Sequence, residues 1–397
     1  MSKFKSILLI LLVFIFYNCD NLDISSEQAD TFMKLFGANN VDIGKDVKVF
    51  DNGYLIAATI IAQDSMHKDI GVIKTDKFGN QEKVLRVGDG GNDEAAKLLV
   101  INSENFLLLG TCYDTVNTNK NIYLGKYNSD LELQWEKLIG NTSDDEGISL
   151  AKANSGYIIV GNTNRANAVN NNPQGVNDIF LIKVDDAGNV EWENSFGGAG
   201  IDIAGDVINI GNGYVIVGTT NSFNEPGQAA NNIIVIETNL AGNENDKFTY
   251  GSANNDEGTS IVRSNEDGYV ITGSIENIAG GNVDVYVAKL GQDIHNVIWT
   301  KAYGTTGTRD FASDIIKTND ALVLVGNQNT GTVERTYFVK IDFDGEILKE
   351  KSYGGYDAQL LYSIERSGDG GFVIVGSSGF EGNEQICLLK VDADGEF

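Results

Sequence analysis

Residues 213–218 read GYVIVG, and similar segments recur along the chain. Each contains a run of mostly apolar residues that begins with an aromatic or aliphatic residue and ends in Gly or Ala. Related segments are GYLIAA at 53–58, NFLLLG at 105–110, GYIIVG at 156–161, GYVITG at 268–273, ALVLVG at 321–326 and GFVIVG at 371–376. A second segment ends in an apolar residue plus glycine, at Gly37, Gly88, Gly140, Gly197, Gly251, Gly304 and Gly354. Successive glycines of this set are 51, 52, 57, 54, 53 and 50 residues apart. A period near fifty, rich in β-branched and aromatic runs, indicates about four strands per repeat.

Seven such repeats predict an all-β fold, a seven-bladed β-propeller of four-stranded antiparallel blades over residues 32–397. We expect the blades at approximately 38–88, 89–140, 141–197, 198–251, 252–304, 305–354 and 355–397. The last repeat stops at Phe397, just past the turn 392–395, so it lacks a fourth strand. Residues 32–37, FMKLFG, have the form of a fourth strand with no blade before it. We therefore expect 32–37 to complete the last blade and close the ring.

The N-terminal residues predict export. Residues 1–18 place Lys3 and Lys5 before the apolar run 7–17, which is short for a membrane-spanning helix and suits a secretory signal peptide. Cys19, directly after this segment, resembles the lipid-modified cysteine of bacterial lipoproteins. The resemblance implies a lipidated Cys19, a tether over 19–31 and a bacterial envelope lipoprotein, which we expect on the outer membrane. A plainly cleaved signal or an uncleaved anchor is the alternative.

The composition excludes several classes of protein. The chain has 29 Lys+Arg against 56 Asp+Glu, a formal net charge of −27, which opposes nucleic-acid binding. Two His and three scattered Cys form no zinc cluster and no disulfide framework. The apolar share of 42% suits a folded body, for which we expect a monomer with no cofactor and no metal.

The repeat itself resembles secreted bacterial propeller lipoproteins, broadly within the quinoprotein-like propeller superfamily. The resemblance rests on the hairpin DGGFVIVG at 369–376, the turn DDAGNVEW at 185–192 and the YGG ending at 353–355. It implies the fold and leaves the activity open, because propellers host many functions. Quinone and metal ligands are not recognisable, so a quinone-dependent dehydrogenase is not implied.

One polar residue recurs where each blade begins. The set is Asp42, Asp93, Asp145, Asp202, Asp256, Asp310 and, in the last blade, Gln359. These positions fall near the mouth of the central channel, on the face that also carries the loops between second and third strands. The carboxylates could form a collar that binds a cation or a positively charged group. Alternatively, each Asp caps its own turn and recurs because the turn recurs.

Two further periodic positions have exceptions. A lysine near the end of the third strand recurs as Lys74, Lys126, Lys183, Lys289, Lys340 and Lys390, while Glu237 replaces it in the fourth blade. We expect these lysines to cover apolar surface and meet a nearby carboxylate. On the fourth strand, tryptophan is kept at Trp135, Trp192 and Trp299, with Lys83, Asp246 and Lys349 at comparable places.

Asymmetry between blades is a better guide to a site than repetition. The loops 162–178 and 219–232 are long and polar, and they contain Arg165 and Phe223. They are either a recognition surface or solvated insertions. His67 and His295 are expected on opposite faces as surface histidines, and the chain shows no catalytic constellation.

These observations predict an envelope-anchored, non-catalytic binding or scaffolding propeller with a protein or glycan ligand. Its binding face would carry the loops between second and third strands and those that join successive blades. The alternative is a carboxylate-dependent carbohydrate-active hydrolase or lyase at the channel mouth. Two facing carboxyl groups with stacking aromatic rings would favour that alternative.

Overall fold

The computed structural model describes residues 31–37, 41–61, 67–88, 90–165, 176–223, 230–264, 268–277, 282–331, 333–354, 359–380 and 383–397. These residues form 28 strands and contain no helix, as expected for an all-β chain. In the same ranges no helix is long and apolar enough to cross a bilayer. The signal-peptide segment, Cys19 and the tether up to residue 30 lie outside the described residues, as do 166–175 and 224–229 of the two long loops.

The strands follow one another as four-stranded antiparallel units. The first two units are β2 (Ile43–Phe50), β3 (Gly53–Ile61), β4 (Lys68–Asp76) and β5 (Gln81–Val87), then β6 (Glu94–Asn102), β7 (Asn105–Asp114), β8 (Asn119–Asn128) and β9 (Leu133–Ile139). The next two are β10 (Asp145–Lys152), β11 (Tyr157–Thr163), β12 (Asp178–Val184) and β13 (Val190–Phe196), then β14 (Asp202–Asn209), β15 (Gly213–Thr220), β16 (Asn232–Asn239) and β17 (Glu244–Tyr250).

The remaining strands continue the pattern. They are β18 (Asp256–Arg263), β19 (Tyr269–Asn277), β20 (Asn282–Leu290) and β21 (Val297–Tyr303), β22 (Arg309–Lys317), β23 (Leu322–Asn329), β24 (Glu334–Ile341) and β25 (Ile347–Tyr353), and β26 (Gln359–Arg366), β27 (Phe372–Phe380) and β28 (Asn383–Val391). A single parallel bridge between Val283 and Arg309 joins β18–β21 and β22–β25 into one eight-stranded sheet.

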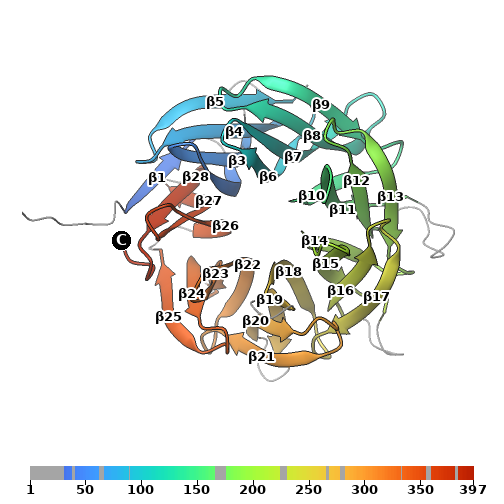
Figure 1. The fold of residues 1–397 in the computed structure, drawn as a ribbon. Helices are drawn as coiled ribbons and strands as arrows, with labels where there is room; N and C mark the ends of the chain where they lie inside the picture. The colour runs from blue at the N-terminus through green and yellow to red at the C-terminus, as the bar shows by residue number, and fades with distance from the viewer. Residues whose placement is uncertain are drawn as a thin grey trace, which may run out of the picture.

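The units stand around a central opening, with their first strands inside and their fourth strands at the rim (Figure 1). Several turns between third and fourth strands contain a glycine with a positive φ, as at Gly188 and Gly242, whose φ angles are +77° and +74°. This arrangement is that of a β-propeller.

The strand β1 (Phe32–Phe36) is the outermost strand of the sheet β1-β28-β27-β26. It runs antiparallel to β28, with Phe32 opposite Lys390 and Phe36 opposite Ile386. Figure 1 shows the start of the described chain beside its end. Phe36 is 8% exposed and packs with Val47 and Ile56 of the next unit. The N-terminal strand therefore contacts both the last unit and the first.

The hydrophobic core lies between neighbouring units. Each cluster joins side chains of two adjacent units, as where Phe106 stacks on Tyr127 and meets Phe50 edge-on. The third strands are buried on both faces, and every residue of β12 is buried. Such double burial explains why these strands read as continuous apolar runs in the sequence.

A polar chain links the innermost strands. Each first strand has a β-bulge, and the residue after the bulge contacts its counterpart on at least one adjacent unit. We call the seven residues the channel girdle, which in order of contact are Ser149, Asp206, Ser260, Asp314, Ser363, Asp46 and Lys97. Hydrogen bonds and one ion pair connect every consecutive pair in that order. The sequence reasoning missed this girdle because Asp, Ser and Lys alternate there, so no single residue type repeats.

Candidate functional site

The six periodic aspartates are buried. Asp42 is 4% exposed and the other five are 0% exposed. Their carboxylates accept hydrogen bonds from their own units: Asp93 from the Tyr113 N–H at 2.8 Å, and Asp256 from the Glu276 N–H at 2.9 Å. Burial raises the pKa of Asp202 and of Asp256, against the hydrogen bonds that each accepts. The acceptors of Asp93 and Asp256 are thus engaged by backbone N–H groups of the second strands β7 and β19.

These aspartates also explain the glycine that ends each repeat. A Cβ on Gly304 would lie 2.4 Å from Asp310 Oδ2 and 2.7 Å from Asp284 Oδ1. Asp284 stands at the third strand of one unit and Asp310 at the first strand of the next. Only glycine leaves room for the two carboxylates, so this element of the repeat serves the junction between units. Gln359, half-buried, begins β26 at the corresponding place.

Arg165 and Phe223, the two candidates from the long loops, both contact side chains of neighbouring strands. Arg165 donates to Asp145 at 2.9 Å and to Glu193 at 2.8 Å, and its guanidinium lies 4.5 Å from the Phe180 ring. Phe223 packs beside a buried cluster, with the Lys247 ammonium 4.5 Å from its ring. The structure brings Arg165 and Asp145 together, and neither residue lines the pocket of about 560 Å³ at the channel mouth.

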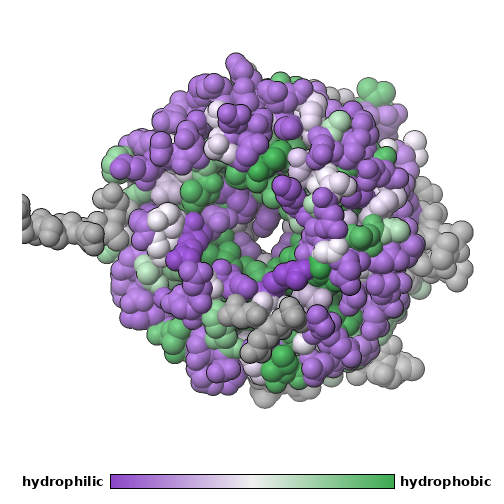
Figure 2. All heavy atoms as spheres, viewed as in Figure 1, coloured by the Kyte–Doolittle hydropathy of each residue, from purple (hydrophilic) through white to green (hydrophobic). Residues whose placement is uncertain are grey.

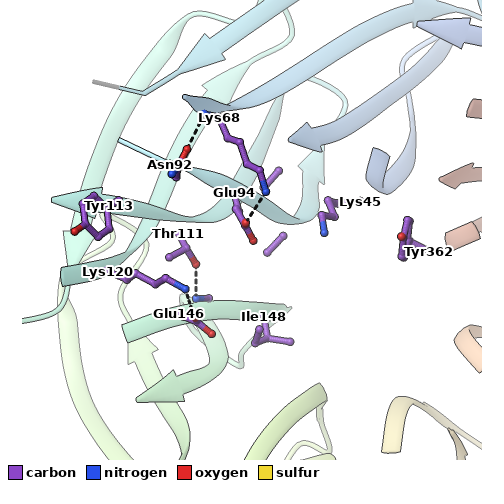
Figure 3. A pocket seen from close by; sticks show the side chains of 13 residues that line it. Lys45, Lys68, Asn92, Glu94, Thr111, Tyr113, Lys120, Glu146, Ile148 and Tyr362 are labelled. Carbon is purple, nitrogen blue, oxygen red and sulfur yellow. Dashed lines mark hydrogen bonds and ion pairs between the residues drawn. The ribbon is translucent and has the colours of Figure 1, made fainter. Parts of the chain in front are cut away.

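A pocket of about 560 Å³ lies where the first, second and third units and the last unit approach the channel. Its lining comes from the starts of β4, β6, β8 and β10, the end of β7, and the inner strands β2 and β26, as Figure 3 shows. It opens on the face that carries the loops between second and third strands. Viewed from the side of Figure 1, the molecule has a largely hydrophilic surface with an opening at its centre (Figure 2).

The β-bulges shape this pocket. The residues that bulge out of the first strands are Lys45, Ala96, Ile148, Gly205, Thr259, Ser313 and Tyr362. Four of them, Lys45, Ala96, Ile148 and Tyr362, line the pocket. A bulge re-aims a side chain away from the pleat, which brings these four to the channel mouth. Unlike the periodic aspartates, the bulged residues differ from unit to unit.

Three lysines and two glutamates give the pocket its charge. Lys68 pairs with Glu94 at 3.4 Å, and Lys120 pairs with Glu146 at 2.5 Å. Lys45 has no hydrogen bond or ion pair to any described residue, and its ammonium lies 5.4 Å from the Tyr362 ring centroid. Burial lowers the pKa of Lys45, and the nearby Glu94 only partly opposes this effect. The pocket therefore holds one cation more than it holds carboxylates.

Sequence reasoning did not find this set of residues. Lys68 and Lys120 share an equivalent position at the start of the third strand, but only in the first two units, and Lys45 comes from a bulge. The one available signal was the absence of repetition: Lys45 and Tyr362 stand at a position that is small or apolar in three other repeats, at Ala96, Ile148 and Gly205.

Comparisons with known proteins show the fold alone. No family model matches the chain, and no curated protein matches it significantly. Among solved structures, the Pan2 WD40 domain of Neurospora crassa superposes with a TM-score of 0.52 at 11% identity over 91% of each chain. The β-propeller domain of the trilobed protease from Pyrococcus furiosus gives 0.54 at 9% identity, over 89% of this chain and 94% of that one. The chain is a β-propeller.

An acylaminoacyl peptidase of Pyrococcus horikoshii also superposes, with a TM-score of 0.51 at 10% identity over 87% of this propeller. The match spans about half of the peptidase, 52% of its length. Propellers of this shape thus occur both as a WD40 domain and as part of a peptidase, so the function has to be argued from the pocket.

Proposed function

We propose that this chain is a seven-bladed propeller, closed by β1 and anchored to the bacterial envelope through Cys19, that binds an acidic glycan in the channel-mouth pocket without transforming it. One observation indicates that the ligand is an anion: Lys45 is a half-buried ammonium without a carboxylate partner. A cation withdrawn from water without a partner is costly, and a bound anion would offset that cost.

The lining also suits a sugar. Tyr113 and Tyr362 bring aromatic rings to the pocket, and such rings combine an apolar face with a polar edge. The pairs Lys68–Glu94 and Lys120–Glu146 offer donors and acceptors for hydroxyl groups. A volume of about 560 Å³ falls within the usual range for ligand pockets. A uronic acid residue, with hydroxyls and one carboxylate, matches this combination.

The hydrolase alternative is less well supported by the same pocket. A glycosidase needs one carboxylic acid and one carboxylate across the scissile bond. Glu94 and Glu146 each have a lysine ammonium within ion-pair distance. The pocket thus presents two ion pairs in place of an acid and a base, and this supports binding over hydrolysis.

Binding of uronate-containing oligosaccharides, measured by calorimetry with product analysis by chromatography, tests the proposal. We expect saturable binding that weakens with added salt, no product, and an affinity at least about tenfold lower in Lys45→Ala, because a hydrogen bond to a charged group contributes about 1.5–3 kcal/mol. The control is Lys301→Ala, whose lysine pairs with the exposed Glu346 at the rim and should bind as the wild type does.

Four results would contradict the proposal. Equal binding of neutral sugars would show that the charge of the ligand is not recognised. An unchanged affinity in Lys45→Ala would show that Lys45 does not bind the ligand. Cleaved sugar would favour the hydrolase. Preference for an acidic peptide over the uronate would overturn the ligand class.

A further inference from the structure

A second repeated contact lies at the rim of the opposite face, where a fourth strand meets the next unit's turn between third and fourth strands. Trp135, Trp192 and Trp299 cover the turn glycines Gly188, Gly242 and Gly345, whose added Cβ would lie 2.5, 2.3 and 3.2 Å from the indole rings. Elsewhere the contact is an ion pair, Lys83 with Asp130 at 3.1 Å and Lys349 with Asp394 at 3.2 Å. We call these pairs rim contacts, and their ordinary role is to hold neighbouring units together.

The rim contact between β17 and the β20–β21 turn has a different chemistry. Asp246 occupies the tryptophan position, and the turn brings His295, with His295 Nε2 2.9 Å from Asp246 Oδ2. Asp293 of the same turn adds a carboxylate, so that one donor atom from each of the three residues lies within 4.8 Å of the others. Asp246 and Asp293 supply oxygen and His295 nitrogen, the donor types that divalent transition metals accept.

Local contacts hold the three donors in place. The His295 N–H donates to Asp293 Oδ1 at 2.9 Å, which orients that carboxylate. The imidazole packs edge-on against Phe248, with ring centroids 4.5 Å apart. Tyr250 donates a hydrogen bond to the Ile294 carbonyl and so fixes the turn from the neighbouring strand. Two units therefore present the donors on ordered backbone, which lowers the cost of arranging them around an ion.

Other departures from the repeat gather at the same junction. A pocket of about 360 Å³ is lined by Asp293 together with Glu237, Arg263 and Tyr269. Glu237 is the acidic exception to the lysine that recurs near the end of the third strand. Two positions that serve stability in other units, those of Asp246 and Glu237, thus carry carboxylates here.

We propose that Asp246, Asp293 and His295 bind a divalent transition metal ion, with zinc as the best match. An imidazole favours zinc over calcium or magnesium, which take oxygen ligands. Three protein ligands leave at least one coordination position open, facing a solvent-accessible rim beside the 360 Å³ pocket. This site is separate from the channel-mouth pocket, so it stands or falls independently of the glycan proposal. It also goes against the expectation from sequence that the chain binds no metal.

Zinc titration of the purified protein, followed by calorimetry and by thermal unfolding, tests the site. We expect one Zn²⁺ per chain, a higher Tm with zinc, and binding at least about tenfold weaker in His295→Ala and in Asp246→Asn. Bound Co²⁺ should show visible absorption bands that both variants lose. The controls are His67→Ala, which removes the other histidine, and Asp130→Asn, which removes the acid of a lysine rim contact.

A purely structural rim contact gives a different result. His295→Ala would then lower the Tm, yet zinc would not change the Tm of the wild type. Zinc binding that survives in both His295→Ala and Asp246→Asn would equally overturn the proposal, because it would place the ion elsewhere on this acidic surface.

Discussion

Replacing Asp46 with asparagine tests the channel girdle. Asp46 is fully buried, accepts hydrogen bonds from Ser363 Oγ at 2.6 Å and Leu98 N at 2.8 Å, and pairs with Lys48 at 3.3 Å and Lys97 at 3.7 Å. At an effective dielectric constant of about 20, each pair contributes an attraction of about 4–5 kcal/mol, and desolvation offsets much of it. Removing one partner of a buried ion pair costs about 3–5 kcal/mol. Because asparagine keeps one hydrogen-bond acceptor, we expect a loss at the lower end of this range, about 3 kcal/mol in the free energy of unfolding.

The assay is urea unfolding of Asp46→Asn against Asp206→Asn at several pH values. Burial would raise the pKa of Asp46, but Lys48 and Lys97 hold it below its ordinary 3.8. This carboxylate therefore stabilises the fold above its unfolded-state pKa, and the contribution disappears as pH falls through the lowered folded-state value.

Asp206 is the matched control, because it occupies an equivalent girdle position and accepts from Ser149 at the same 2.6 Å, while burial raises its pKa. A raised carboxyl pKa has the opposite effect on stability, because the charged carboxylate then destabilises the fold at neutral pH. Asp206→Asn should therefore lose less free energy of unfolding than Asp46→Asn. Equal losses at pH 7, or a loss in Asp46→Asn that persists unchanged in acid, would refute the reasoning.

Three further predictions concern packing and reactivity. Phe36→Ala should lower the free energy of unfolding by about 3 kcal/mol in urea titration, because it empties the contact between β1 and the first unit. Gly242→Ala should lower the Tm, since φ is +74° and the new methyl would lie 2.3 Å from Trp192, with a cost of at least about 1–2 kcal/mol; Gly211→Ala, at φ +88° with nothing nearby, isolates the backbone part. Burial raises the pKa of Cys387 to about 12, so this thiol should resist a thiol reagent at pH 8 in the native state and react once urea unfolds the chain.

The sequence predicted the fold because the features that build it recur. The GYVIVG strand, the turn glycines and the apolar third strands each reflect one local requirement that every unit shares, and the structure places them as expected in β15, β12 and their equivalents. The segment 32–37 could be assigned because its spacing matches the other fourth strands. The structure pairs it with β28.

The pocket and the rim site were not predicted, for a physical reason. Lys45 and Tyr362 reach the channel mouth through β-bulges, and a bulge depends on pairing between strands that the linear pattern does not show. Asp246 and His295 are 49 positions apart in the chain and meet only because adjacent units pack side by side. Repetition in the sequence identifies what each unit needs, whereas these sites depend on contacts between unlike residues of different units.

A disulfide between β1 and β28 tests closure of the ring most directly. Leu35 and Cys387 are register partners on antiparallel strands, so their side chains leave the sheet on the same side. In a protein with Cys19 and Cys112 changed to serine, Leu35→Cys refolded in oxidising glutathione should form an intramolecular disulfide, visible as a faster non-reducing gel band. The adjacent Lys34→Cys, which pairs with Leu388 and points the other way, should not. A link in Lys34→Cys but not Leu35→Cys, or disulfide-bonded dimers alone, would contradict the closed propeller.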